Sequence, residues 1–341
     1  MSNICNSVER ILIIGLGSIG KRHARIIKEL FPEIKIIALR HKIFDSSDVD
    51  SLGLYDCVDS IEKAMLLNPD AAIVANPSSL RLNIMKSLAN AGVHILAEKP
   101  ISATTDGIQD LINLCSAKGV VLMTGYNLRF LPSLIKFREQ IQTGKVGKIL
   151  SFQVEVSQNL LDWRPNIDYK KTVSSQKKLG GGVLLELSHE IDYINWIFGK
   201  IKWVKSHVSR QSDLEIDVED HANIIFGFKN QDDYETIGHL NMNFYQYDPS
   251  RNCKVVGDRG TLLWDGLSGE IKFYGRTEKK WKTVFSSSPT RDFTYTSEIQ
   301  NFLTAINSNE EPLVSGDDGL LTLQVINAIH QSSEQEKIIY L

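Results

Sequence analysis

Cysteine is scarce in this chain of 341 residues, and long apolar runs and blocks of one charge sign are missing. The four cysteines, Cys5, Cys57, Cys115 and Cys253, have no CxxC spacing, so the sequence predicts neither a zinc site nor a disulfide framework. No apolar run reaches the length of a membrane span, and none precedes a cleavage site near the N-terminus. A net charge of −3 without basic blocks argues against binding to nucleic acids or membranes. We expect a cytoplasmic protein with reduced thiols.

The first 125 residues alternate short apolar runs with segments of helical period. This alternation is typical of repeated βαβ units and predicts an α/β fold, a doubly wound parallel sheet of the Rossmann class. The expected strands are Arg10–Ile14, Lys35–Leu39, Ala71–Ala75, His94–Ala97 and Val120–Thr124, and the expected helices include Ser18–Leu30, Ser79–Ala91 and Thr105–Ala117. We therefore assign residues 1–125 to one domain.

After Gly125 the pattern changes to longer runs in which apolar and polar residues alternate. In Ile149–Gln158 the apolar side chains recur at every second position, which predicts a strand with one buried face. Similar runs occur at Lys202–Val208, Ala222–Phe228, Ile237–Tyr245, Asn252–Val256, Thr261–Trp264 and Glu270–Tyr274, and helical segments at Leu131–Thr143, Gly182–Phe198, Phe293–Asn307 and Gly319–Ser332. Residues 126–341 are expected to form an α+β domain with a large open, mostly antiparallel sheet.

A glycine-rich segment, Gly15-Leu16-Gly17-Ser18-Ile19-Gly20, joins an expected strand to an expected helix. In this order the first glycine permits a tight turn, the second lets the backbone approach a pyrophosphate, and the third allows close helix–strand packing. The anion would rest on the N-terminus of the helix. We interpret Gly15, Gly17, Ser18, Ile19 and Gly20 as dinucleotide-binding residues, and the alternative is an ordinary glycine turn.

The end of the second expected strand bears on the choice of cofactor. Dinucleotide-binding folds usually place an acidic residue there, where it binds the ribose hydroxyls. Here Lys35–Leu39 is followed by Arg40-His41-Lys42, which contains no carboxylate. Cationic side chains suit a ribose 2′-phosphate better than a bare diol, so Arg40 and His41 favour NADP over NAD. The alternative for Arg40 is a solvated surface arginine.

The fourth expected strand ends in Glu98-Lys99-Pro100. In doubly wound sheets ligands bind beyond the carboxyl ends of the strands, so we expect Lys99 to project into the cofactor crevice. A lysine there hydrogen-bonds a substrate hydroxyl and stabilises developing negative charge. The alternative is a surface lysine in a loop.

The segment after Gly180-Gly181-Gly182 has helical period throughout. Glu186, His189 and Tyr193 form a polar stripe that we expect to face solvent or a cleft, away from an apolar seam of Leu184, Leu187, Ile191, Ile194 and Phe198. Histidine suits proton transfer near neutral pH, and the alternative is a capped or solvent-facing side chain. The spacing of Glu186 and His189 also occurs in carboxylate-bridged metal sites, but no second such pair follows, so we predict no metal.

Together these residues make the chain resemble the Gfo/Idh/MocA family, which groups glucose–fructose oxidoreductase, inositol dehydrogenase and rhizopine-catabolism proteins. The resemblance spans nearly the whole chain and rests on the glycine turn, Ala75-Asn76-Pro77, Glu98-Lys99-Pro100, Gly125–Phe130, Gly180–Gly199, Gly257–Thr261 and Glu298–Phe302. It implies a Rossmann domain followed by an α/β domain whose open sheet forms the interface of a homodimer or homotetramer. It also implies hydride transfer between nicotinamide and a hydroxyl carbon of a sugar, nucleotide sugar or related polyol.

The resemblance further implies roles for single residues. Lys99 would be the catalytic lysine and His189 the acid/base, with Glu186 as its partner. One departure matters, because family members usually carry Asp four residues before the histidine, whereas Glu186 stands three before His189. Further residues implied in cofactor binding are Asn76, Pro77 and Glu98, and those implied in substrate binding are Tyr126, Arg129, Arg164, Tyr169 and Asp192.

The substrate branch and a competing function class follow from the same comparison. Asp162-Trp163-Arg164-Pro165, with Tyr169 after it, resembles the branch associated with bacterial surface-sugar pathways. Arg164, Lys170 and Lys171 would pair with a substrate carboxylate or phosphate, and the alternative is a solvated charged loop. A dinucleotide-binding regulator without turnover is the other function class that this fold serves. The presence of both Lys99 and His189 favours the enzyme.

Overall fold

The chain forms two compact units. The computed structural model describes residues 8–40, 52–163, 167–229 and 234–341. One unit comprises Met1–Asn127 and Arg291–Leu320, and the other comprises Leu128–Thr290 and Leu321–Leu341. The second predicted domain, residues 126–341, thus contains a segment that the structure groups with the first unit.

The first unit contains a six-stranded sheet with the order β3-β2-β1-β4-β5-β6. Every neighbouring pair is parallel, which confirms the predicted doubly wound sheet. Its strands are β1 (Arg10–Ile14), β2 (Lys35–Leu39), β3 (Asp56–Val58), β4 (Ala71–Val74), β5 (His94–Glu98) and β6 (Leu122–Gly125). The central strands β1 and β4 are almost wholly buried because helices cover both faces of the sheet.

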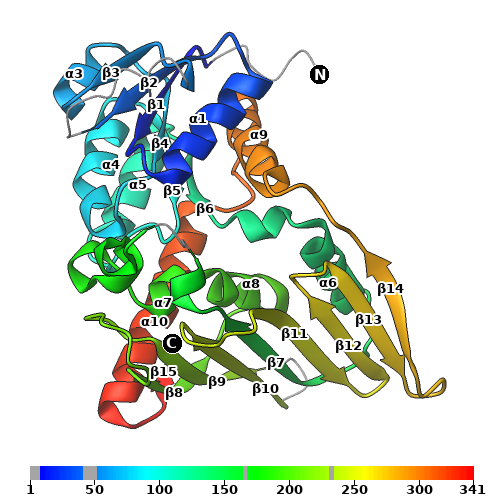
Figure 1. The fold of residues 1–341 in the computed structure, drawn as a ribbon. Helices are drawn as coiled ribbons and strands as arrows, with labels where there is room; N and C mark the ends of the chain where they lie inside the picture. Colours follow the sequence, from blue (N-terminus) through cyan, green and yellow to red (C-terminus); the bar gives the residue numbers. More distant parts are fainter. Residues whose placement is uncertain (1–7, 41–51, 164–166, 230–233) are drawn as a thin grey trace. The chain divides into compact units, whose positions relative to one another are not determined.

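Helices lie along the two faces of this sheet. Figure 1 shows α4 and α5 on one face and α1 and α9 on the other. The helices are α1 (Ser18–Leu30), α3 (Ile61–Met65), α4 (Arg81–Asn90), α5 (Ile108–Lys118) and α9 (Phe293–Ser308), with a 3₁₀ turn η1 (Ser78–Leu80). The helix α10 (Gly316–Gln335) begins in the first unit and ends in the second. Among the described residues, no helix is both long and apolar enough to cross a membrane.

The second unit contains a nine-stranded sheet with the order β14-β13-β12-β11-β7-β10-β9-β8-β15. All neighbouring pairs are antiparallel except β7 and β10, so the sheet is mixed but mostly antiparallel, as predicted. The strands are β7 (Ile149–Ser157), β8 (Trp203–Ser209), β9 (His221–Lys229), β10 (Glu235–Asn243), β11 (Ser250–Gly257), β12 (Gly260–Asp265), β13 (Glu270–Gly275), β14 (Trp281–Ser286) and β15 (Ile339–Tyr340). The sequence pattern did not predict β3, β14 or β15.

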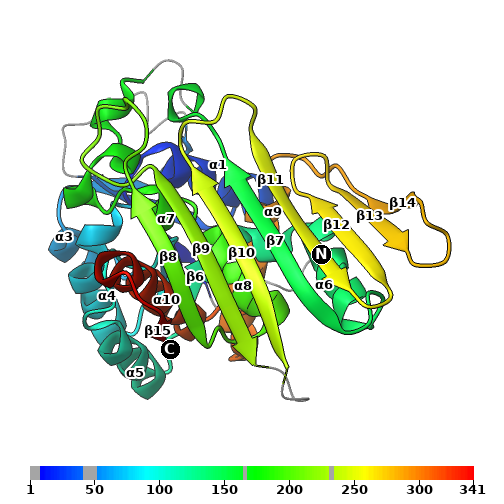
Figure 2. The same ribbon diagram turned by 90° about the horizontal axis from the view of Figure 1, so that it is seen from below.

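One face of this sheet is buried and the other is open. Figure 2 shows the strands from the open side, with α6 (Pro132–Gln142) and α8 (His189–Phe198) behind them. The ring of Trp264 is fully buried, donates from Nε1 to Ser133 Oγ at 3.0 Å and packs edge-on against Tyr193. The remaining elements of the second unit are the helix α7 (Val183–Glu186) and the 3₁₀ turns η2 (Asn127–Phe130), η3 (Leu160–Asp162), η4 (Tyr169–Lys171), η5 (Val173–Ser175) and η6 (Lys177–Leu179), of which η2 begins at the last residue of the first unit.

The single helix predicted for Gly182–Phe198 is wrong, because the chain forms α7 and α8 with a break at Leu187 and Ser188. The helical stripe drawn through Glu186, His189 and Tyr193 is therefore broken as well. Tyr193 is fully buried in the core of the second unit, so it does not face solvent or a cleft.

Candidate active site

The glycine turn after β1 has the geometry that a bound pyrophosphate needs. Gly15 has φ +92°, and a Cβ on it would lie 2.9 Å from the backbone nitrogen of Asn76. A Cβ on Gly20 would lie 2.0 Å from the carbonyl oxygen of Gly15, so this position requires glycine for packing. A Cβ on Gly17 would meet nothing within 4 Å. Space is thus left open at the N-terminus of α1, beside the exposed Ser18 and the half-buried Ile19, and this fits a dinucleotide.

The turn lies where the strand order of the first sheet reverses, between β1 and β4. The amide of Ala75 donates to Ile14 O at 2.8 Å, which places Asn76 and Pro77 beside Gly15. Arg40 directly follows β2, and its amide donates to Val58 O at 3.0 Å. In open α/β sheets this switch point is where ligands bind. His41 lies outside the described residues.

Lys99 follows β5 at the same carboxyl edge of the sheet and is half-buried. Its backbone amide donates to Glu98 Oε2 at 3.2 Å. The guanidinium of Arg81 donates to the carbonyl oxygens of Glu98 and Pro100, so hydrogen bonds hold the chain on both sides of Lys99. The Glu98 carboxylate also bonds to His23 Nε2 at 2.7 Å, which gives this predicted cofactor-binding side chain partners within the protein.

In the second unit, Gly181 and Gly182 of the glycine triplet Gly180–Gly182 pack tightly against neighbouring backbone and side chains. A Cβ on Gly181 would lie 2.2 Å from Val173 O, and one on Gly182, at φ +109°, would lie 2.3 Å from Glu219 Oε1. Two elements follow: α7, which carries Glu186, and α8, which begins at His189.

Glu186 and His189 differ in their surroundings although both are half-buried. Glu186 Oε2 accepts a hydrogen bond from Ser174 Oγ at 2.7 Å. His189 is the first residue of α8, directly after the break at Leu187 and Ser188. The break releases His189 from the helical spacing that the sequence suggested, so the distance along the chain does not fix its relation to Glu186.

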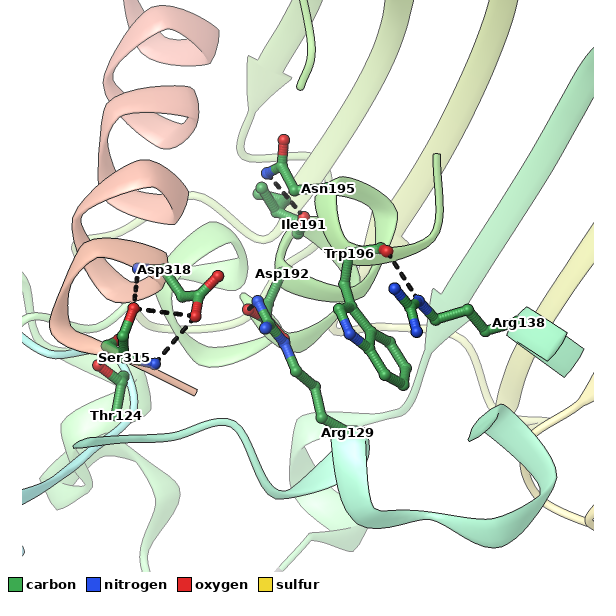
Figure 3. Close-up of polar contacts among 9 residues, drawn as sticks. All are labelled: Thr124, Arg129, Arg138, Ile191, Asp192, Asn195, Trp196, Ser315 and Asp318. Carbon is green, nitrogen blue, oxygen red and sulfur yellow. Dashed lines mark hydrogen bonds and ion pairs between the residues drawn. The ribbon is translucent and has the colours of Figure 1, made fainter. Parts of the chain in front are cut away.

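Arg129 and Asp192 form a buried ion pair with two hydrogen bonds (Figure 3). Arg129 Nε donates to Asp192 Oδ2 at 2.9 Å, and Arg129 Nη2 donates to Asp192 Oδ1 at 2.7 Å. The side chains are 5% and 1% exposed. Arg138 donates from Nε to Trp196 O at 3.0 Å. Burial lowers the pKa of Arg138, and the positive charge of Arg129 lowers it further. The structure therefore brings two predicted substrate ligands together as partners of each other.

The other predicted substrate ligands are placed differently. Tyr126 is fully buried in the first unit, and its amide donates to Thr124 O at 2.8 Å. Figure 3 also shows Thr124 beside Ser315, whose carbonyl oxygen accepts from Thr124 Oγ1 at 3.1 Å. Tyr169 Oη accepts from the amide of Glu215 at 3.2 Å. Arg164 lies outside the described residues.

Sequence reasoning missed two buried groups and one half-buried group around these positions. His23 and Glu298 lie beside Glu98 in the first unit. Glu219 lies over Gly182, and burial raises its pKa to about 7. The sequence signal for Glu298 was its place in Glu298–Phe302, one of the segments on which the family resemblance rests. The resemblance assigned no role to this residue. No sequence pattern indicated His23 or Glu219, because their partners are far along the chain.

Comparison with protein families confirms the resemblance. The Gfo/Idh/MocA model described as "Oxidoreductase family, NAD-binding Rossmann fold" matches residues 9–126. The model described as "Oxidoreductase family, C-terminal alpha/beta domain" matches residues 138–341. The two matches together span most of the chain.

Individual relatives match over nearly their whole length. The uncharacterized oxidoreductase YrbE of Bacillus subtilis is 27% identical over 94% of this chain and 93% of that protein. Myo-inositol 2-dehydrogenase of Thermotoga maritima is 25% identical over 97% of this chain and 98% of that protein. A solved levoglucosan dehydrogenase in complex with NADH has the same fold, with a TM-score of 0.85 at 18% identity over 97% and 98% of the two chains. The chain belongs to the Gfo/Idh/MocA family of oxidoreductases.

Proposed function

We propose that this chain is a nicotinamide-dependent dehydrogenase that oxidises a hydroxyl-bearing carbon of a sugar, nucleotide sugar or related polyol, or reduces the corresponding carbonyl. The observation that carries the proposal is the glycine turn at the switch point of the first sheet, with Lys99 at the same carboxyl edge. Relatives named for inositol, levoglucosan and UDP-sugar chemistry support the substrate class.

The residues that would hold the dinucleotide are Gly15, Gly17, Ser18, Ile19 and Gly20, since the N-terminus of α1 and the open space at Gly17 suit a pyrophosphate. When bound, the nicotinamide ring exchanges a hydride with the substrate carbon.

Lys99 and His189 carry the proton chemistry in this proposal. Lys99 hydrogen-bonds the substrate hydroxyl and stabilises the negative charge that develops on its oxygen. His189 takes the hydroxyl proton in the oxidising direction and returns it in the reducing direction. Glu186, held by Ser174, is the carboxylate assigned to orient His189.

The loop between β7 and α7 bears on which kind of sugar is the substrate. Lys170 pairs with Glu215 and Lys171 with Asp168, and the lysine side chains are 44% and 82% exposed. Exposed ion pairs of this kind contribute little to stability, so an anionic group of the substrate can replace the carboxylates of Glu215 and Asp168 as the partners of these lysines. We infer a nucleotide sugar or acidic sugar, consistent with a place in bacterial surface-glycan biosynthesis.

NADP is the proposed cofactor, supported by Arg40 directly after β2 and by the absence of a carboxylate in the sequence Lys35–Lys42. The measurement is fluorescence titration of NADPH and NADH with wild type and Arg40→Ala. We expect the variant to lose affinity for NADPH and to keep its affinity for NADH. Wild-type binding of NADH far tighter than of NADPH contradicts this assignment.

The open face of the nine-stranded sheet is the proposed interface between copies of the chain. In Figure 2 no helix of the described part of the chain lies across this face. It carries apolar side chains such as Ile225 and Ile237, which are 41% and 36% exposed, among polar neighbours. Light scattering after gel filtration is expected to give a homodimer or homotetramer, and Ile237→Lys is expected to shift it toward the monomer.

Lys99→Ala tests the proposed activity. Retained nucleotides are first identified by mass spectrometry, and free and nucleotide sugars are then screened for cofactor reduction. We expect Lys99→Ala to lower kcat by about 10²- to 10⁴-fold while the cofactor still binds. The exposed Lys118→Ala is the matched control. Undiminished turnover in Lys99→Ala would refute the role, and a wild type without turnover on any sugar would favour the regulator.

A further inference from the structure

Three buried side chains meet in the first unit behind Lys99. His23 comes from α1, Glu98 from the end of β5 and Glu298 from α9, and their exposed fractions are 0%, 6% and 0%. One ligand-capable atom from each side chain lies within 4.8 Å of the others. We call these three residues the buried triad.

The hydrogen bonds of the buried triad are unequally distributed. Glu98 is well bonded, through Oε1 to His23 Nε2 at 2.7 Å and through Oε2 to the amide of Lys99 at 3.2 Å. Within the described residues, neither carboxyl oxygen of Glu298 has a hydrogen-bond partner. Because a buried carboxyl without a partner is costly, the state of Glu298 needs a physical explanation.

The pKa values of Glu298 and Glu98 offer an explanation for the unpartnered carboxyl of Glu298. Burial raises the pKa of Glu298 well above its ordinary value, and the nearby Glu98 raises it further. Burial is the largest single influence on Glu98 and opposes its ionisation too, but the hydrogen bond to His23 and the neighbouring charges together lower the pKa of Glu98. Among these charges are those of Arg81 and Lys99. These influences favour a protonated Glu298 beside an ionised Glu98.

A neutral carboxylic acid is a hydrogen-bond donor, and the ionised Glu98 is an acceptor in the buried triad. The remaining titratable neighbour on α9 is Tyr295, whose pKa burial and then Glu98 raise to about 12, so its hydroxyl is also neutral. Arg22 on α1 faces the Tyr295 ring at 4.8 Å.

We propose that Glu298 is a positioning residue for Lys99: its carboxyl lies within 4.8 Å of Glu98 without a hydrogen-bond partner among the described residues, and a small side-chain rotation would let it donate to Glu98 and, with His23, hold the carboxylate that accepts the Lys99 amide. Gly125 contributes to the same fit, since a Cβ there would lie 3.2 Å from Glu98 Cα and 3.3 Å from Glu98 Oε2. This inference rests on the proposed function only where it concerns the Lys99 amine, because the protonation of Glu298 is measurable without turnover.

The test compares Glu298→Gln with Glu298→Leu. Glutamine keeps the shape and offers an amide donor to Glu98, whereas leucine removes the donor. We expect Glu298→Leu to lower kcat by about 10- to 100-fold through misplacement of Lys99, with the KM for the sugar and the affinity for the cofactor unchanged. Glu298→Gln is expected to restore most of the kcat that leucine loses.

Thr294→Val is the matched control, because it removes a buried hydrogen bond of α9 outside the buried triad, from Asn127 Nδ2 to Thr294 Oγ1 at 2.9 Å. A loss of kcat in Thr294→Val as large as in Glu298→Leu would assign the effect to helix packing and overturn the proposal. A loss in Glu298→Gln as large as in Glu298→Leu would overturn it too.

Infrared difference spectroscopy of wild type against Glu298→Gln decides the protonation directly. We expect wild type at neutral pH to show the carbonyl stretch of one protonated carboxylic acid that Glu298→Gln lacks, since the band of Glu219 is common to both proteins and cancels in the difference. Absence of the Glu298 band overturns the proposal, as does a stoichiometric divalent metal, found by elemental analysis of the wild type and lost in Glu298→Gln. Because these readouts need no substrate, a wild type without turnover would refute the proposed function while the infrared band still tests the state of Glu298.

Discussion

We predict that Glu219 makes the stability of the second unit depend on pH near neutrality. Its Oε1 accepts the amide of Leu184 at 3.2 Å, and its carboxyl group lies over Gly182 at the start of α7. Burial is the largest cause of its raised pKa of about 7, and Asp220 beside it raises the pKa further. The ordinary value for this group is 4.5.

The sign of the effect follows from proton binding. Between pH 4.5 and about 7 the folded protein binds the Glu219 proton and the unfolded chain does not. The stability that this proton confers is fully present below pH 4.5 and is lost as the pH rises through about 7. At about 1.36 kcal/mol per pKa unit, the difference corresponds to an upper limit of about 3 kcal/mol.

Glu219→Gln removes this dependence, because the amide does not ionise and its oxygen still accepts the Leu184 amide. We expect the free energy of unfolding of the variant, relative to wild type, to rise by up to about 3 kcal/mol between pH 5 and pH 8. Urea unfolding followed by tryptophan fluorescence measures it. All five tryptophans lie within residues 128–290, so the signal reports on the second unit alone.

Glu215→Gln is the matched control, since Glu215 is an exposed carboxylate on the same stretch of chain, 72% exposed in its pair with Lys170. Its difference from wild type should stay nearly constant with pH. If the difference between Glu219→Gln and wild type is equally flat from pH 5 to pH 8, the assignment of a proton-binding Glu219 is refuted.

Two further predictions concern the glycine turn and the buried ion pair. Gly20→Ala should prevent correct folding of the first unit, because its Cβ would lie 2.0 Å from Gly15 O, whereas Gly17→Ala should fold and lose dinucleotide affinity. Circular dichroism measures the folding of each variant, and NADPH titration measures its affinity. Equal folding of the two variants would contradict the packing argument. Asp192→Asn removes the carboxylate that pairs with the buried Arg129 and should destabilise the second unit by about 3–5 kcal/mol in urea unfolding. A loss below about 1 kcal/mol, the level of an exposed pair, would show that the pair is solvated.

Local patterns predicted much of the fold. The bounds of β1, β2 and α1 agree with the expected ranges, because apolar runs and helical period are set by neighbours along the chain. The strand β14 has no such signal: it lies at the edge of the sheet, and most of its residues are exposed, so no alternation marks it. The break at Leu187 and Ser188 was also hidden, since neither residue is a glycine or proline that stops a helix.

The candidate site was predictable in its residue types and less so in its contacts. Position at a strand end is enough to single out Lys99, and the glycine turn is recognised from the strand before it and the helix after it. The pairing of Arg129 with Asp192 joins residues 63 positions apart, and the pairing of His23 with Glu98 joins residues 75 apart. Such pairings depend on tertiary packing, which periodicity does not record.

The discontinuity of the first unit has a consequence for its synthesis on the ribosome. Residues 1–127 emerge long before Arg291–Leu320, which supplies α9 with its buried Ile299, Phe302 and Leu303. Until α9 arrives, the nascent Rossmann unit has an uncovered apolar surface beside α1 and lacks the Ser315 carbonyl that accepts from Thr124. The entire nine-stranded sheet, apart from β15, is made during this interval. Folding of the dinucleotide-binding unit is therefore completed late in translation, and the waiting intermediate is a natural client for chaperones.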